Sequence, residues 1–191
     1  MTARLLQQSL RILILLTLLL GFAYPALVTA IARVAFPAQA AGSVVMRDKQ
    51  LVGSRLLGQN FTAPGYCWGR PSATGAQPYD AMASSGSNLG PSNPELIAAV
   101  QARRAALQAA DPLHRPEVPI DLVTASASGL DPDISLAGAL WQAPRIAAAR
   151  GIDATRVRAL IDRLARRSWL GFLGEPRVNV LELNLALDAP R

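Results

Sequence analysis

The residues that most often carry catalysis or hold metal ions are scarce in this chain. It contains one cysteine, Cys67, and one histidine, His114, which lies in a proline-flanked stretch. A single cysteine excludes an internal disulfide and multi-cysteine metal sites, and a single histidine leaves zinc sites and histidine-based triads without their usual parts. The side chains that remain available for chemistry are carboxylates and serines.

Three aspartates near the middle of the chain could together bind a cation. These are Asp121, Asp131 and Asp133, but their spacing matches no calcium-binding loop. The same residues suit turns and helix caps equally well, so we expect structural roles for them. Ser126 and Ser128 have no general base nearby in the sequence, which leaves a nucleophilic serine with little support.

A glycine-containing stretch, residues 86–90, invites comparison with a phosphate-binding loop. It lacks the Gly-Lys-Ser/Thr ending of such loops, and the only lysine of the chain, Lys49, lies far upstream. These features exclude a Walker-type nucleotide site. Arg70 could face a carboxylate, although the Gly69-Arg-Pro-Ser72 stretch is equally explained as a turn.

The net charge of +6 does not indicate binding to nucleic acid. All acidic residues, and all basic residues except Arg4 and Arg11, follow Ala32 and are spread along the remaining sequence. Dense basic clusters interleaved with aromatic residues are absent from the sequence, so we expect no nucleic-acid partner.

An uncharged apolar stretch precedes the part of the chain that would position these side chains. It runs from residue 12 to residue 32 and would span about 31 Å as a helix, the thickness of a bilayer core. Gly21 and Pro25 within it are tolerated by membrane helices. Ala38-Gln39-Ala40 resembles a signal-peptidase motif, which leaves a cleaved, secreted module as the alternative. The apolar run is too long for a typical signal peptide, so we predict a retained transmembrane helix over residues 12–32.

The charges beside this helix predict its orientation. Arg4, Arg11 and the free amine precede it, and the sequence before it contains no acidic residue. By the positive-inside rule, residues 1–11 form a short cytoplasmic N-terminus and the rest of the chain lies outside the cytoplasm. Residues 33–52 are predicted to be a juxtamembrane connector, and residues 53–191 an extracytoplasmic domain.

The pattern of residues 53–191 predicts a mixed α/β domain of the α+β class. Asn93 can cap a helix that begins at Pro94, and Asp153 can cap an amphipathic helix. Ser135 can cap a helix through Trp141, which Pro144 would kink or restart and which would end at Gly151. The other expected segments, in order, are a short strand over residues 53–61, an irregular region over 62–94, a loop over 111–119, a strand or turn over 120–125, turns over 126–133, the amphipathic helix over 154–167, and a strand entering a helical turn over 177–188.

Several unusual segments, taken in order, are similar to one family, the C subunit of the Kdp potassium-transporting ATPase. They are Gly53-Ser54 with Leu57-Gly58-Gln59-x-Phe61, Gly69-Arg-Pro-Ser-Ala73, Ser85-Gly-Ser-Asn-Leu-Gly-Pro-Ser-Asn-Pro94, Asp121-Leu-Val-Thr-Ala-Ser126, Ser128-Gly-Leu-Asp131, Trp141-Gln-x-Pro-Arg145, and Asn179-Val with Leu183-Asn-Leu-Ala-Leu-Asp188. The resemblance covers nearly the whole chain. Cys67, where an aromatic is expected, and Leu136, where a proline is expected, depart from the pattern.

The resemblance implies a non-catalytic accessory subunit in the bacterial inner membrane, with a single membrane helix and a periplasmic domain. Its implied partners are a channel-like A subunit that conducts potassium and a P-type B subunit that hydrolyses ATP. The resemblance also implies that this subunit is needed for the assembly and activity of the complex and that it raises the affinity of the pump subunit for ATP. No cofactor is expected to bind firmly, and ATP enters only through the complex.

The resemblance also implies specific site residues. Gln142 matches a proposed nucleotide contact. However, a domain outside the cytoplasm cannot reach cytoplasmic ATP across the bilayer. The alternative role for Gln142 is a buried side chain that holds a helix break before Pro144. Asn88 and Ser92 lie in a motif expected at a partner interface. The other candidates are small residues that allow close helix packing, Gly21, Ala23, Ala26 and Ala30, and acidic residues that could concentrate cations, Asp80, Asp121 and Asp131.

The leading hypothesis is therefore an accessory subunit whose helix docks on its partners and whose domain caps the extracellular entrance for potassium. Two other classes remain open from the residues alone. One is an extracytoplasmic binding module, anchored or secreted, and the other is an anchored enzyme that uses carboxylates.

Overall fold

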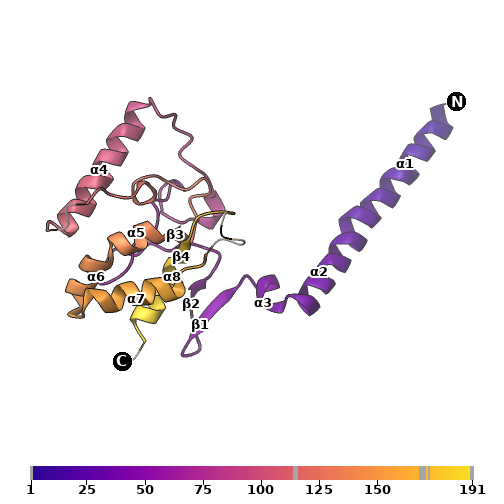
Figure 1. The fold of residues 1–191 in the computed structure, drawn as a ribbon. Helices are drawn as coiled ribbons and strands as arrows, with labels where there is room; N and C mark the ends of the chain where they lie inside the picture. Colours follow the sequence, from indigo (N-terminus) through magenta and orange to yellow (C-terminus); the bar gives the residue numbers. More distant parts are fainter. Residues whose placement is uncertain (1, 114–115, 168–170, 172, 190–191) are drawn as a thin grey trace. The chain divides into compact units, whose positions relative to one another are not determined.

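The computed structural model describes residues 2–113, 116–167, 171 and 173–189. The chain divides into two compact units, residues 1–44 and residues 45–191, which are considered separately (Figure 1). His114, part of the loop predicted over residues 111–119, lies outside the described residues.

The N-terminal unit consists mainly of one long apolar helix in three segments. These are α1 (Thr2–Leu18), the π-helical η1 (Leu19–Ala23) and α2 (Tyr24–Ala35). From Ala3 to Ala35 the helix is long and apolar enough to cross a membrane, and none of its side chains is buried. It contains the predicted span and continues beyond it at both ends. The π turn precedes Pro25, which lacks the N–H needed for the normal bond to the carbonyl four residues earlier.

A short helix and a hairpin follow the membrane helix. The helix α3 (Pro37–Ala40) precedes strands β1 (Val44–Arg47) and β2 (Gln50–Ser54). The two residues between the strands, Asp48 and Lys49, have φ of 51° and 64°, as a type I′ turn requires. The prediction of a strand over residues 53–61 was therefore wrong, and the predicted juxtamembrane connector, residues 33–52, contains helix α3, strand β1 and the start of β2. Strand β2 ends at Ser54, close to the residue where a strand was expected to begin. The hairpin was missed because its turn lacks the glycine that usually identifies a two-residue hairpin turn.

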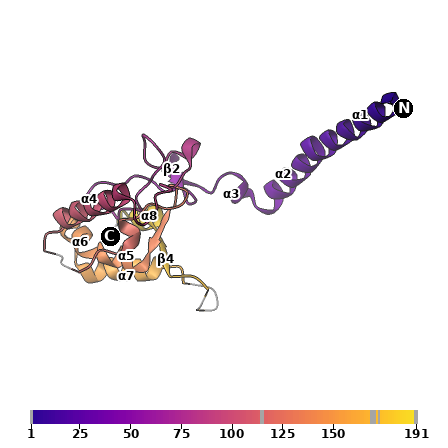
Figure 2. The same ribbon diagram turned by 90° about the horizontal axis from the view of Figure 1, so that it is seen from above.

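The domain is a mixed α/β structure, as predicted, with four short helices packed around one small sheet. Strand β3 (Asp133–Ser135) pairs antiparallel with β4 (Arg177–Asn179), so that Ile134 lies opposite Val178. Each strand leads directly into a helix, β3 into α5 (Leu136–Trp141) and β4 into α8 (Val180–Leu187). The helices α6 (Ala143–Arg150) and α7 (Ala154–Leu164) complete the group, which stays together in both views (Figure 2).

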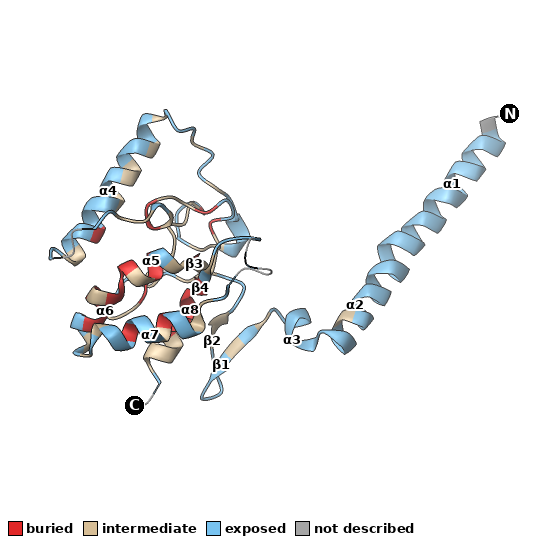
Figure 3. Ribbon diagram, viewed as in Figure 1, coloured by how far each residue is buried: buried red, intermediate tan, exposed pale blue. Residues whose placement is uncertain are grey.

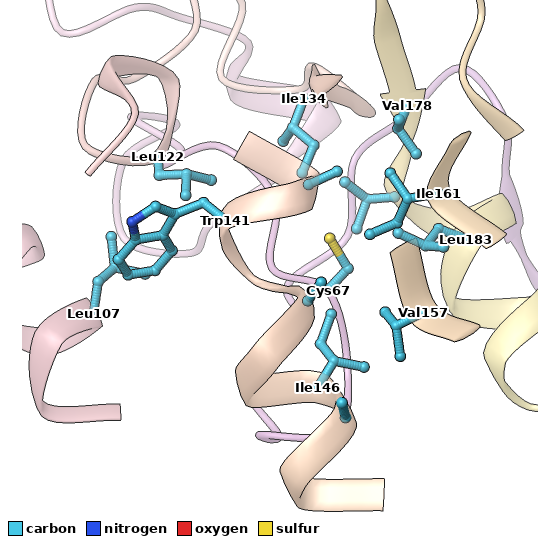
Figure 4. Close-up of a cluster of buried hydrophobic side chains, with 14 of the residues drawn as sticks. Cys67, Leu107, Leu122, Ile134, Trp141, Ile146, Val157, Ile161, Val178 and Leu183 are labelled. Atoms are coloured by element: carbon cyan, nitrogen blue, oxygen red, sulfur yellow. The ribbon is translucent and has the colours of Figure 1, made fainter. Parts of the chain in front are cut away.

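The hydrophobic core lies between these helices and the sheet. Ile134, Val178, Ile161 and Leu183 meet on one side of Cys67, and Trp141 packs with Leu107 and Leu122 on the other (Figure 4). Buried residues concentrate on α5 to α8, whereas α4 (Pro94–Ala110) is mostly exposed and buries only Leu107 (Figure 3). The core is thus built by the C-terminal half of the chain, with Cys67 inserted from a distant segment.

The three predicted helix caps are confirmed. Asn93 accepts from the Glu95 N–H at 2.8 Å, Ser135 from Gly138 at 2.9 Å, and Asp153 from Thr155 at 2.7 Å. The backbone N–H and the hydroxyl of Thr155 both donate to Asp153, which stabilises its ionised form and lowers its pKa. The predicted end of α6 is confirmed as well, because Gly151 adopts the left-handed conformation with φ of 62°.

One helix boundary differs from the prediction, and one open alternative is settled. Helix α7 ends at Leu164 rather than residue 167, because the backbone of Arg166 pairs with that of Arg177 beside the sheet. Residues 120–125 contain the 3-10 helix η3 (Ile120–Leu122), so the turn alternative was right and the strand alternative wrong. Apart from the 3-10 helix η2 (Ala81–Ala83), the region 62–94 is irregular as predicted, and residues 177–188 form the predicted strand and helix.

Candidate functional site

Gln142 occupies the break between helices α5 and α6. Pro144 lies in the first turn of α6, and its missing N–H favours a new helix start there over a continuous helix. The Gln142 side chain is 0% exposed. Whatever this residue binds must therefore lie inside the domain as it is folded here.

The side-chain amide of Gln142 is fully used by hydrogen bonds within the domain. Its Oε1 accepts from the Trp68 N–H at 2.9 Å and from Arg145 Nη2 at 2.6 Å. Its Nε2 donates to the carbonyls of Trp68 at 3.0 Å and Gly138 at 3.3 Å. The interpretation of Gln142 as a buried tie at a helix break is confirmed. A direct nucleotide contact stays a prediction, and it would require these bonds to be broken.

Asn184 makes an equivalent pair of hydrogen bonds with the backbone of Cys67, the residue before Trp68. Its Oδ1 accepts from the Cys67 N–H at 2.8 Å, and its Nδ2 donates to the Cys67 carbonyl at 2.9 Å. We call Gln142 and Asn184 together the amide clamp. The clamp satisfies the backbone groups of Cys67 and Trp68, as a neighbouring strand would do in a sheet.

Asn184 is not among the functional residues expected from the sequence. Its signal is a polar amide within the otherwise apolar run Leu183-Asn-Leu-Ala-Leu187 of a buried helix. Buried amides of this kind are usually hydrogen-bonded to specific partners. The partner, however, lies 117 residues away in the sequence and is not visible from the local pattern.

The side chain of Cys67, the only thiol of the chain, is buried as a neutral thiol and is not nucleophilic. It is 0% exposed, and burial raises its pKa to about 12. Since the thiolate is the reactive form, a thiol with this pKa is protonated and inert at neutral pH. Cys67 acts as a small apolar residue at the centre of the core (Figure 4).

Arg145 lies over the ring of Trp68, with its guanidinium carbon 3.8 Å from the ring centroid. It also donates to the Pro64 carbonyl and to Gln142. Burial lowers its pKa to about 10, so it remains charged at neutral pH. This buried cation connects α6 to the 64–68 segment and reinforces the amide clamp.

A second set of contacts holds the end of α8 against the same segment. Arg150 forms an ion pair of 2.8 Å with Asp188 and donates to the Gly65 carbonyl. The Tyr66 hydroxyl donates to the other oxygen of Asp188 at 2.9 Å. The segment 64–68 is therefore fixed at both ends and in its middle.

The three aspartates expected to concentrate cations each have a local structural contact. Asp80 accepts from the Met82 N–H at 2.9 Å, and Asp121 from the Ser135 N–H at 2.7 Å. Asp131 forms an ion pair of 3.2 Å with Arg70, which answers the question of which carboxylate Arg70 faces. Across the described ranges, no three His, Cys, Asp or Glu side chains group as metal ligands would. An effect of these aspartates on cations stays a prediction.

The proposed interface residues fall in both units of the chain. Asn88 and Ser92 are exposed in the loop before α4, and Asn88 has a φ of 53°. The four small residues are exposed along the membrane helix, Gly21 and Ala23 in η1, Ala26 and Ala30 in α2. All six are accessible for contact, and none belongs to the amide clamp.

These features define a class of protein: a helix long and apolar enough to cross a membrane, followed by a domain whose buried amides bond to its own backbone. A model of the KdpC family, the K+-transporting ATPase c chain, matches residues 6–189. The chain belongs to this family.

Relatives of known name agree along nearly the full length. The potassium-transporting ATPase KdpC subunit of Methylibium petroleiphilum is 63% identical over 187 residues, covering 98% of both chains. The subunit of the same name from Polaromonas naphthalenivorans is 59% identical over 184 residues, covering 96% of this chain and 94% of the relative. That of Sorangium cellulosum is 59% identical over 186 residues, covering 97% and 98%.

Proposed function

We propose that this chain is a non-catalytic accessory subunit of an ATP-driven potassium uptake complex, needed for its assembly and activity. Its partners are a channel-like A subunit and an ATP-hydrolysing B subunit, with the domain on the periplasmic side of the inner membrane. The observation that carries the proposal is the family match over residues 6–189, which includes both the membrane helix and the domain. Neither part of the chain is left over for a separate function.

The membrane helix is proposed to dock on the partner subunits within the bilayer. Its side chains from Ala3 to Ala35 are unburied, so they are available to lipid and to other helices. Gly21, Ala23, Ala26 and Ala30 would allow a partner backbone to approach closely. The π turn at η1 widens the helix beside Gly21 and sets this stretch apart from a regular helix.

The domain is proposed to cap the extracellular potassium entrance, with Asn88 and Ser92 at the partner interface. A firmly clamped domain suits this role, because a cap must keep its shape while its partners change conformation. We further propose that any effect on the ATP affinity of the pump subunit passes through assembly. The supporting observation is that the Gln142 amide has its hydrogen-bonding atoms occupied within the domain.

The test is purification of the complex from native membranes with three forms of this chain. One form is intact, one lacks residues 1–35, and one carries an unrelated apolar helix of equal length in their place. We expect the A and B subunits to accompany only the intact chain, and potassium-dependent ATP hydrolysis to require it. Equal assembly and transport with all three forms would refute helix docking. Absence of both subunits from the intact form would refute the proposed function itself.

A further inference from the structure

A groove lies between α7 and the C-terminal end of α8. Its volume is about 670 Å³, and it is lined by apolar side chains that include Ile152, Leu160 and Leu187. Arg156 and Arg163 line the same groove and are exposed. We call this feature the basic groove. It combines apolar side chains with the guanidinium groups of two arginines.

The charge of the basic groove is positive and not neutralised from within. Arg150 and Asp188 also line it, but they form an ion pair with each other. Arg156 and Arg163 form no ion pair with any residue of the described ranges. The acidic residues on and next to α7 do not line the groove, since Asp153 caps the helix and Asp162 is not among the lining side chains.

The two arginines are placed to act together. They are seven residues apart on one helix, which is two turns, so both project from the same face about 10 Å apart along the axis. Guanidinium groups bind phosphate through paired hydrogen bonds. An inorganic phosphate would use the arginines but leave the apolar floor uncovered.

We propose that the basic groove binds an anionic phospholipid, with the headgroup phosphate at Arg156 and Arg163 and part of an acyl chain along the apolar floor. Only the residues between α2 and β1, residues 36–43, separate the membrane helix from the hairpin that begins the domain. Even fully extended they would reach about 30 Å, so the tether keeps lipid at high effective concentration near the domain. The bound lipid holds the domain against the bilayer surface.

The experiment uses the full chain in uncharged detergent micelles. Dihexanoyl phosphatidylglycerol, dihexanoyl phosphatidylcholine and inorganic phosphate are each titrated, and hydrogen exchange of the α7 amides is followed. The variant is Arg156→Gln with Arg163→Gln. The matched control is Arg104→Gln with Arg158→Gln, which removes the same charge from exposed positions outside the groove.

We expect phosphatidylglycerol to slow exchange in α7 and the control variant to respond as the parent chain does. The groove variant should bind about 30-fold more weakly, from the usual contribution of each arginine near an anionic surface. Circular dichroism melts of both variants establish that they are folded. Exchange is read in α7 itself, so lipid around the membrane helix does not contribute.

Each contrary result overturns the proposal. Equal protection by phosphatidylcholine would leave no role for the arginines, and equal protection by inorganic phosphate would make the groove a simple anion site. Unchanged affinity in the groove variant would place the lipid elsewhere. Protection of α7 that appears only with the A and B subunits, and without lipid, would identify the groove as a protein interface. The three results obtained with lipid or phosphate alone do not depend on whether the proposed function is right.

Discussion

The most decisive prediction concerns the amide clamp, and the perturbation is Gln142→Met. Methionine has nearly the length and volume of glutamine but can neither donate nor accept these hydrogen bonds. The substitution leaves the Trp68 N–H and carbonyl, which Gln142 binds at 2.9 Å and 3.0 Å, without their partner in the interior. It also removes the 2.6 Å acceptor of Arg145, a buried cation.

The magnitude follows from these lost bonds. A buried polar group left without a partner costs about 1–3 kcal/mol, and a charged one more. Two backbone groups and one weakened arginine contact therefore predict a loss of about 3–5 kcal/mol in the free energy of unfolding. Since small domains have about 5–15 kcal/mol in total, the variant should be close to its limit of stability.

The assay is urea unfolding of the full chain in mild detergent, followed by tryptophan fluorescence. The matched control is Gln101→Met at an exposed position of α4, which should change the free energy by no more than about 0.5 kcal/mol. A loss below about 1 kcal/mol for Gln142→Met would refute the reasoning. Unchanged domain stability together with weaker ATP affinity in the complex would instead support a direct nucleotide contact.

Three further predictions test other parts of the domain. Cys67 has its pKa raised from 9.0 to about 12, so the native state keeps its proton where the unfolded state loses it. Its contribution to stability is therefore complete below pH 9 and falls as the pH rises from 9 toward 12, and unfolding titrations should lose this pH dependence in Cys67→Ala. Gly58→Ala should lower the unfolding free energy by about 1–3 kcal/mol, because a Cβ there would lie 2.6 Å from a backbone oxygen. Its control is Gly90→Ala, where a Cβ would have no atom within 4 Å, and urea unfolding should show a far smaller loss for this variant. Asp188→Asn should cost about 1–2 kcal/mol and lower the melting temperature, because it weakens the 2.8 Å pair with Arg150; an unchanged melting temperature would show that this pair contributes nothing.

The elements predicted correctly are those whose signals are local. A cap such as Asn93 and the residues it bonds lie within one turn, so the sequence contains the whole interaction. The restart of the helix at Pro144 and the left-handed end at Gly151 likewise depend on the backbone chemistry of one residue. The long apolar run needed no partner at all, because its length and lack of charge suffice to predict a membrane helix.

The hairpin shows where local signals fail. Its turn residues, Asp48 and Lys49, adopt left-handed conformations that neither residue type favours strongly. The early end of α7 could not be predicted locally either. The backbone of Arg166 pairs with that of Arg177, which lies too far along the sequence to affect local helix propensity. At the end of α7 a tertiary contact thus overrides a local helix preference.

The sequence by itself determined the membrane helix, the order of most elements and the family to which the chain belongs. Only the tertiary structure decided what the polar residues do. Gln142 and Trp68 are 74 residues apart, and Asn184 and Cys67 are 117 apart. A side-chain amide bonds equally well to solvent, ligand or backbone, so its role depends on what the fold places beside it and on whether water is excluded there. In this domain the fold places the backbone of Cys67 and Trp68 beside both amides, and the groups that could have formed a site hold the chain together.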